Sequence, residues 1–148
     1  MQQLESLAEL AALVRRRKGL YVRWAPSPEH RPGTSRDELT GMELPGLSVN
    51  SLDPEPWWRG QSLELWLARR LYDYCHLRHD RRRDTKPWVL GGRVVGSGPD
   101  NEPLLTDPEP VGQISTAVLD EAHGLLREHA RHDADWGPLR RPSQLGRN

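Results

Sequence analysis

The sequence has few of the residues that mark specialised classes of protein. Its 148 residues include one cysteine, Cys75, and no phenylalanine. A single cysteine cannot form an intrachain disulfide and cannot build a metal site by itself, and this usage is typical of a reducing cytoplasm. Cys75 is most simply interpreted as a small buried residue on a helix rather than as a nucleophile.

Net charge and long apolar runs are also missing. The 21 Lys and Arg residues balance 21 Asp and Glu residues, and a zero net charge argues against a nucleic-acid or anionic-membrane partner. No apolar run approaches the roughly 18 residues that a membrane-spanning helix needs. Glu5 and Glu9 precede the first arginines, which is the reverse of a secretory signal. We therefore expect a cytoplasmic protein with no membrane partner.

Apolar residues at helical spacing predict three helices. The first has its apolar stripe from Leu4 onward, and Gly19 can close it. The second is capped by Ser62 and runs to about His79. The third spans about 115–131. Helices therefore lie at both ends of the chain and near its middle.

Short runs of β-forming residues predict strands between these helices. Residues 20–24 alternate in character, which places Tyr21 and Arg23 on one face of a strand and the apolar residues on the other. Residues 44–50 form a turn that delivers a second short strand. Two strands therefore precede the middle helix.

A hairpin is predicted after the middle helix. Residues 87–90 and 93–95 are the strands, and Gly91 with Gly92 accepts the positive φ angles of a two-residue type I′ turn. Another short strand follows at 103–105.

These elements predict an α+β fold with about three helices and a short, mostly antiparallel or mixed sheet. The strands follow one another too closely for a series of βαβ units. The length fits a single globular domain, which we place at 1–139, with a loosely ordered tail at 140–148. Residues 25–45 are rich in Pro, Gly, Ser, Thr and charge, a composition typical of a functional lid or mobile loop.

The most informative stretch lies between the last two predicted strands. Asp100, Asn101 and Glu102 stand between glycines and prolines, which exclude a helix and constrain the backbone of a loop. Loops of this kind often carry function. An ordinary Asx-type turn that enters the strand at 103–105 is the alternative.

The histidines give little support to metal chemistry. Outside the predicted loop they fall in two groups, which are His76 with His79 and His123 with His129 and His132. Neither group has an HExxH pattern or a neighbouring cysteine pair. We therefore expect no metal cofactor.

Three polar residues follow the predicted strands in order. Arg23 lies in the first strand, Ser48 in the second, and Glu102 at the entry to a later one. This order resembles the Arg, Ser, Glu pattern of the toxin-like ADP-ribosyltransferases. The matching segments are 20–24, 47–50 and 101–105.

The resemblance implies an ADP-ribosyltransferase-like fold and an enzyme that cleaves the nicotinamide glycosidic bond of NAD, its co-substrate. By the same resemblance Arg23 would bind a phosphate of NAD, and Ser48 would order the site. Glu102 would hold the ribose hydroxyl and stabilise an oxocarbenium-like transition state. Asp100 stands where the family usually has Glu or Gln, so the acceptor stays open. Further candidate contacts are Tyr21 and Asn50 for the cofactor, and Trp57, Trp58, Asp100 and Asn101 for the substrate.

The chain also resembles a family of small actinobacterial proteins of uncharacterised function. The resemblance covers most of 19–139 and rests on residues 20–24, 43–48, 56–58 and 96–103. It supports a single domain and adds no known activity.

Two other functions fit the same residues. One is a non-catalytic module that binds a small-molecule ligand or an unidentified protein through its Pro- and Trp-rich loops. The other is a small biosynthetic enzyme that uses Glu102 or Asp100 as general base. The candidate residues also have structural interpretations: Trp57 and Trp58 as a lid on the core, and Arg23 as the partner of Asp37, Asp53 or Glu102 in an ion pair.

Overall fold

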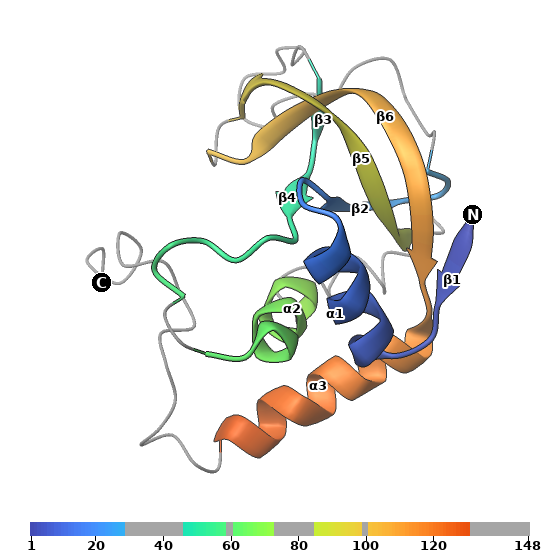
Figure 1. The fold of residues 1–148 in the computed structure, drawn as a ribbon. Coiled ribbons are helices and arrows are strands. Elements are labelled where there is room, and N and C mark those ends of the chain that lie inside the picture. Colours follow the sequence, from blue (N-terminus) through green and yellow to red (C-terminus); the bar gives the residue numbers. More distant parts are fainter. Residues whose placement is uncertain (29–45, 59–60, 73–84, 99–100, 131–148) are drawn as a thin grey trace.

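The fold combines helices on one side with a curled, mostly antiparallel sheet on the other (Figure 1). The computed structural model describes residues 1–28, 46–58, 61–72, 85–98 and 101–130. Within these ranges the helices are α1 (Leu7–Arg16), α2 (Leu63–Tyr72) and α3 (Thr116–Ala130). The strands are β1 (Gln2–Leu4), β2 (Tyr21–Ala25), β3 (Leu47–Ser48), β4 (Asn50–Ser51), β5 (Lys86–Ser97) and β6 (Pro103–Ile114). The predicted α+β class is thereby confirmed.

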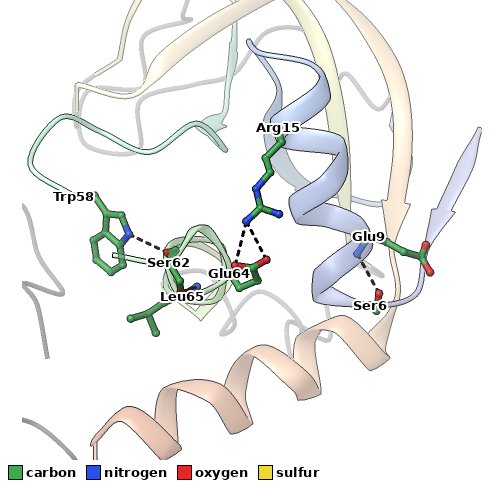
Figure 2. A network of polar contacts seen from close by, with 7 residues as sticks. All are labelled: Ser6, Glu9, Arg15, Trp58, Ser62, Glu64 and Leu65. Atoms are coloured by element: carbon green, nitrogen blue, oxygen red, sulfur yellow. Dashed lines mark hydrogen bonds and ion pairs between the residues drawn. The ribbon is translucent and has the colours of Figure 1, made fainter. Parts of the chain in front are cut away.

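Serine caps explain where α1 and α2 begin. The Ser6 hydroxyl accepts a hydrogen bond from the Glu9 backbone N–H at 3.1 Å, and the Ser62 hydroxyl accepts one from the Leu65 N–H at 3.1 Å (Figure 2). Each bond satisfies a donor that the first turn of a helix leaves unpaired. The predicted cap at Ser62 is therefore confirmed.

The first helix begins later than its apolar spacing predicts. Leu4 lies in β1, which pairs in parallel with the end of β6, opposite Ile114. Leu4 is fully buried there, so the sheet provides the burial that its helical spacing suggested. The helix starts only after the Ser6 cap.

The sheet is built around a hairpin of two 12-residue strands, β5 and β6. The strand order is β1-β6-β5-β2-β4, and β3 also pairs with β6. Only β1 runs parallel to its described neighbour. Strand β3 pairs with β6, and β4 pairs with β2. The short segment 47–51 therefore connects the outer edges of β6 and β2, so the sheet is curled.

The predicted turn at Gly91 and Gly92 is wrong, because both glycines lie inside β5. Gly92 has a φ of +147°, and the pairing register shifts between Gly91 and Arg93. A Cβ on Gly92 would lie 2.8 Å from Leu105 Cγ. The glycines therefore form a bulge with a close approach to the neighbouring strand, which is the other common role of glycine in a strand.

Two apolar cores lie on the two faces of β2 and β5. The helix-side core consists of Leu4, Leu7, Leu10, Ala11, Leu13, Val14, Leu20, Val22, Leu52, Trp58, Leu65, Trp66, Leu67, Ala68, Leu71, Val89, Ile114, Val118, Leu119, Ala122 and Leu126. The sheet-side core consists of Ala25, Leu47, Val49, Trp88, Leu90 and Leu105. Strand alternation divides the residues of β2 and β5 between the two cores. In β2, Val22 lies in the helix-side core while Tyr21 packs against the sheet-side core, as the sequence predicts.

Several predictions concern residues outside the described part of the chain. They are residues 29–45 of the loop predicted over 25–45, the end of the second helix near His79 with Cys75 and His76, the residue Asp100, and the chain from 131 onward with the predicted boundary at 139. The division into one domain and a tail stays a prediction. In the part of the chain that is described, no helix is long and apolar enough to cross a membrane.

Candidate functional site

The loop that joins β5 to β6 carries the polar residues singled out in the sequence. The Gly98 N–H donates to the Glu102 carbonyl at 2.8 Å, and the Asn101 N–H donates to the Gly98 carbonyl at 2.9 Å. Asn101 has a φ of 61°, a left-handed conformation that asparagine tolerates better than most residues. The hairpin connection thus has a left-handed residue directly before Glu102. Glu102 therefore stands where the loop closes.

Glu102 is buried, which is unusual for a glutamate. It is 9% exposed, and it shares this burial with only two other polar or charged side chains of the described residues, Arg69 and Arg70. A carboxyl group removed from water interacts more strongly with a neighbouring charge than an exposed one does. The burial of Glu102 therefore suits a carboxylate that stabilises a neighbouring positive charge.

Arg23 and Ser48 are brought into direct contact. Arg23 lies on β2 opposite Trp88 of β5, and its side chain shares a face with Tyr21. Its Nη1 donates to the Ser48 backbone carbonyl at 3.0 Å in a partly buried position. The guanidinium therefore links β2 to β3, two strands that are far apart in sequence.

The strand that carries Ser48 is held beside the start of β6. Ser48 pairs with Leu104, and the Val49 N–H donates to the Pro103 carbonyl at 3.1 Å. Glu102 precedes this pairing by two residues along the chain. Arg23, Ser48 and Glu102 therefore lie on adjoining segments, linked by one side-chain bond and one strand pairing.

Gly46 explains how β3 approaches β6 so closely. A Cβ on Gly46 would lie 2.9 Å from the Leu105 carbonyl oxygen and 3.1 Å from the Leu105 nitrogen. Real Cβ atoms essentially never approach other atoms within 3.0 Å. A glycine at position 46, directly before β3, is thus needed for this close contact between backbones.

The two further candidate cofactor contacts lie on neighbouring strands. Tyr21 of β2 pairs with Ser51 of β4, and Asn50 pairs with Val22. Leu47 and Val49 face the sheet-side core, so strand alternation directs the Ser48 side chain to the opposite face. The contact that Arg23 makes with Ser48 is to its backbone carbonyl.

Trp57 and Trp58 belong to a different part of the molecule. They form an edge-to-face cluster with Trp66, with ring centroids 5.4–5.7 Å apart. Trp58 is buried in the helix-side core, and its Nε1 donates to the Ser62 carbonyl at 3.2 Å (Figure 2). Core packing accounts for this placement, and the predicted substrate contact of the two tryptophans stays a prediction.

Two arginines beside this cluster are buried, which the sequence did not lead us to expect. Arg69 and Arg70 of α2 are 7% and 5% exposed. The Arg69 guanidinium carbon lies 5.2 Å from the Trp57 ring centroid, and that of Arg70 lies 4.7 Å from the Trp66 centroid. Such cation–π contacts gain strength when desolvated. The signal was present, because Arg69 and Arg70 follow Trp66 at the i+3 and i+4 helical positions.

The Arg–Trp cluster also includes an acidic residue. Arg70 Nη2 lies 3.9 Å from Glu55 Oε1, and the Trp57 Nε1 donates to Glu55 Oε2. The paired charges and rings tie the segment before α2 to the helix. This cluster stabilises the fold at the helix-side core.

Comparison with known proteins places the chain in a family without giving it an activity. Residues 1–137 match the model of a family of unknown function, DUF6098, so the chain belongs to this family. No curated protein and no solved structure matches it. Within the described ranges, no three His, Cys, Asp or Glu side chains gather in a way that could hold a metal ion.

Proposed function

We propose that this member of the family binds NAD and cleaves its nicotinamide glycosidic bond at a site built from Arg23, Ser48 and Glu102. The observation that carries the proposal is the 3.0 Å bond from Arg23 Nη1 to the Ser48 carbonyl. Through the pairing of β3 with β6, this bond links Arg23 to the segment that begins with the buried Glu102. Segments from three parts of the sequence thus lie side by side, which supports the proposal.

A buried carboxylate supplies what the bond cleavage requires. As the bond from C1′ of the ribose to nicotinamide breaks, the bonding electrons leave with nicotinamide and positive charge develops on the ribose. A fixed carboxylate stabilises that charge, and more strongly in a site that excludes water. Water or another acceptor then adds its oxygen or nitrogen to C1′ and loses a proton. Glu102 is the residue proposed for this stabilisation.

Arg23 supports the binding step in the proposed site. A guanidinium has five N–H donors in a fixed fork, so the bond to the Ser48 carbonyl fixes its direction and keeps its charge. A positive charge in this position attracts the diphosphate of a dinucleotide. The acceptor of the ADP-ribose group is left open by this proposal.

The experiment is calorimetric titration of the full chain with NAD, followed by assay of the same sample for nicotinamide. We expect saturable binding and nicotinamide release. Arg23→Ala should weaken NAD binding about tenfold or more, because it removes a charged contact. Arg93→Ala is the matched control, since Arg93 is well exposed on β5 and its only described ion pair lies at 3.7 Å.

Each other outcome decides against the proposal in a different way. NAD binding without release would indicate a non-catalytic binding module. If the protein neither binds NAD nor releases nicotinamide, NAD is not its ligand. Equal NAD affinities of the wild type and Arg23→Ala would show that Arg23 has a purely structural role.

A further inference from the structure

The side chain of Glu102 occupies the space beside Gly98. A Cβ placed on Gly98 would lie 1.6 Å from Glu102 Oε1, 2.4 Å from Cδ and 3.1 Å from Oε2. Ordinary contacts of a Cβ begin at 3.4 Å. The carboxyl group therefore fills the volume that any side chain at position 98 would need.

The backbone fixes the two residues opposite each other. The Gly98 N–H donates to the Glu102 carbonyl at 2.8 Å, across the mouth of the hairpin loop. The Gly98 carbonyl in turn accepts from the Asn101 N–H at 2.9 Å. Both backbone groups of Gly98 are engaged, and the Glu102 carboxyl group lies beside the Gly98 α-carbon.

The space beside Gly98, and not a positive φ angle, is what favours glycine at this position. Among the described glycines, positive φ angles occur at Gly19 and Gly92. Gly98 has no such angle, so its φ does not by itself require glycine. An alanine at position 98 would place a Cβ in the space that the Glu102 carboxyl group occupies.

We propose that Gly98 is a positioning residue for Glu102. Its missing Cβ forms a seat that holds the carboxyl group against the mouth of the hairpin, and a larger residue expels the group from that seat. The seat itself depends only on the geometry, whereas its consequence for catalysis rests on the proposed function. Because the carboxyl group ends a flexible side chain, the expected response is displacement of Glu102 and not unfolding.

The direct test measures the accessibility of the Glu102 carboxyl group. The wild type, Gly98→Ala and Gly96→Ala are labelled with a carbodiimide and an amine, and labelling at each glutamate is followed by mass spectrometry. Gly96→Ala is the matched control, because its Cβ would meet nothing closer than Leu104 Cδ1 at 4.0 Å. Exposed Glu109 is the internal reference.

We expect Gly98→Ala to raise the labelling rate of Glu102 about tenfold, with Glu109 unchanged and Gly96→Ala equal to the wild type. An unchanged labelling rate of Glu102 in Gly98→Ala would overturn the proposal. If Gly98→Ala does not fold, the double variant Gly98→Ala/Glu102→Ala is made. We expect this double variant to fold and to have the same melting temperature as Glu102→Ala. Failure to fold there would also overturn the proposal.

A second readout separates the seat from the proposed function. Gly98→Ala should lower kcat for nicotinamide release at least tenfold while KM for NAD stays within about twofold, and Gly96→Ala should keep both values. If the wild type releases no nicotinamide, the proposed function fails. The labelling result still decides whether Gly98 holds the Glu102 carboxyl group in place. If Glu102 labels faster and kcat is retained, the positioning role is overturned.

Discussion

The inner and outer halves of β5 have the same hydrogen-bonded neighbour, β6, and very different surroundings. In the inner half, which we define as 86–91, Val89 is fully buried in the helix-side core, and its neighbours face the sheet-side core. In the outer half, 92–97, Val94 and Val95 are 47% and 42% exposed. Strand β2 pairs only with the inner half.

The difference shows that burial between two cores, and not strand pairing as such, anchors this hairpin. The outer half extends from the anchored part and ends in the loop that carries Gly98 and Glu102. The outer half has two valines and the inner half has one, so β propensity does not explain why the inner half is the buried one. The buried inner half thus supports an exposed outer half that carries the polar loop.

The same substitution in each half gives the largest expected contrast. Val89→Ala should lower the free energy of unfolding by about 2–3 kcal/mol, because it leaves a cavity in the helix-side core. Val95→Ala should lower it by less than about 1 kcal/mol. Chemical denaturation measures both, and equal losses would contradict the division of the hairpin.

The bulge where the two halves meet gives the next largest effect. Gly92→Ala should lower the free energy of unfolding by more than about 1 kcal/mol, because of the φ of +147° and the contact at 2.8 Å with Leu105. Gly96→Ala, in the outer half, meets only an ordinary contact and should be neutral or slightly stabilising. Two similar values would show that the bulge imposes no special demand.

The loop residue Asn101 has a smaller expected effect. Asn101→Ala should cost about 1 kcal/mol of unfolding free energy, because alanine is strained at a φ of 61°. Asn101→Gly should cost almost nothing, since glycine adopts that conformation readily. A loss of the same size in both variants would assign the effect to the Asn101 side chain instead of the backbone.

The ion pair near the bulge has the smallest expected effect. Arg17 Nη2 lies 2.8 Å from Glu109 Oε2, and both side chains are exposed. Glu109→Gln should change the free energy of unfolding by less than about 1 kcal/mol, and the difference should shrink at high salt. A loss that is independent of salt would indicate that packing of Arg17 over Gly91 matters more than its charge.

Local patterns were enough to predict the elements whose stabilising contacts are close in sequence. Ser62 caps its helix through a bond to a residue three positions away, and the alternation of Tyr21 and Val22 between two faces follows from the strand itself. Leu4 and Gly92 were misjudged because distant partners decide their structure. Leu4 fits a helical stripe until β6 pairs with it, and Gly92 fits a turn until Leu105 is seen beside it.

The candidate site shows the same limit. The order of Arg23, Ser48 and Glu102 along the strands was visible in the sequence, and their segments adjoin in the fold. That the three residues form one site stays a prediction. That Arg23 uses the Ser48 carbonyl, and that Gly98 makes room for Glu102, depends on contacts between strands that no spacing encodes.

The most direct test compares nicotinamide release from NAD by the wild type and by Glu102→Gln, with the melting temperature of each measured in the same buffer. Glu102→Gln keeps the shape of the side chain and removes its negative charge. The proposed role predicts a loss of release of at least about 100-fold, with melting temperatures that agree within a few degrees. Equal rates of release, or a collapse of the melting temperature with unchanged release, would contradict it.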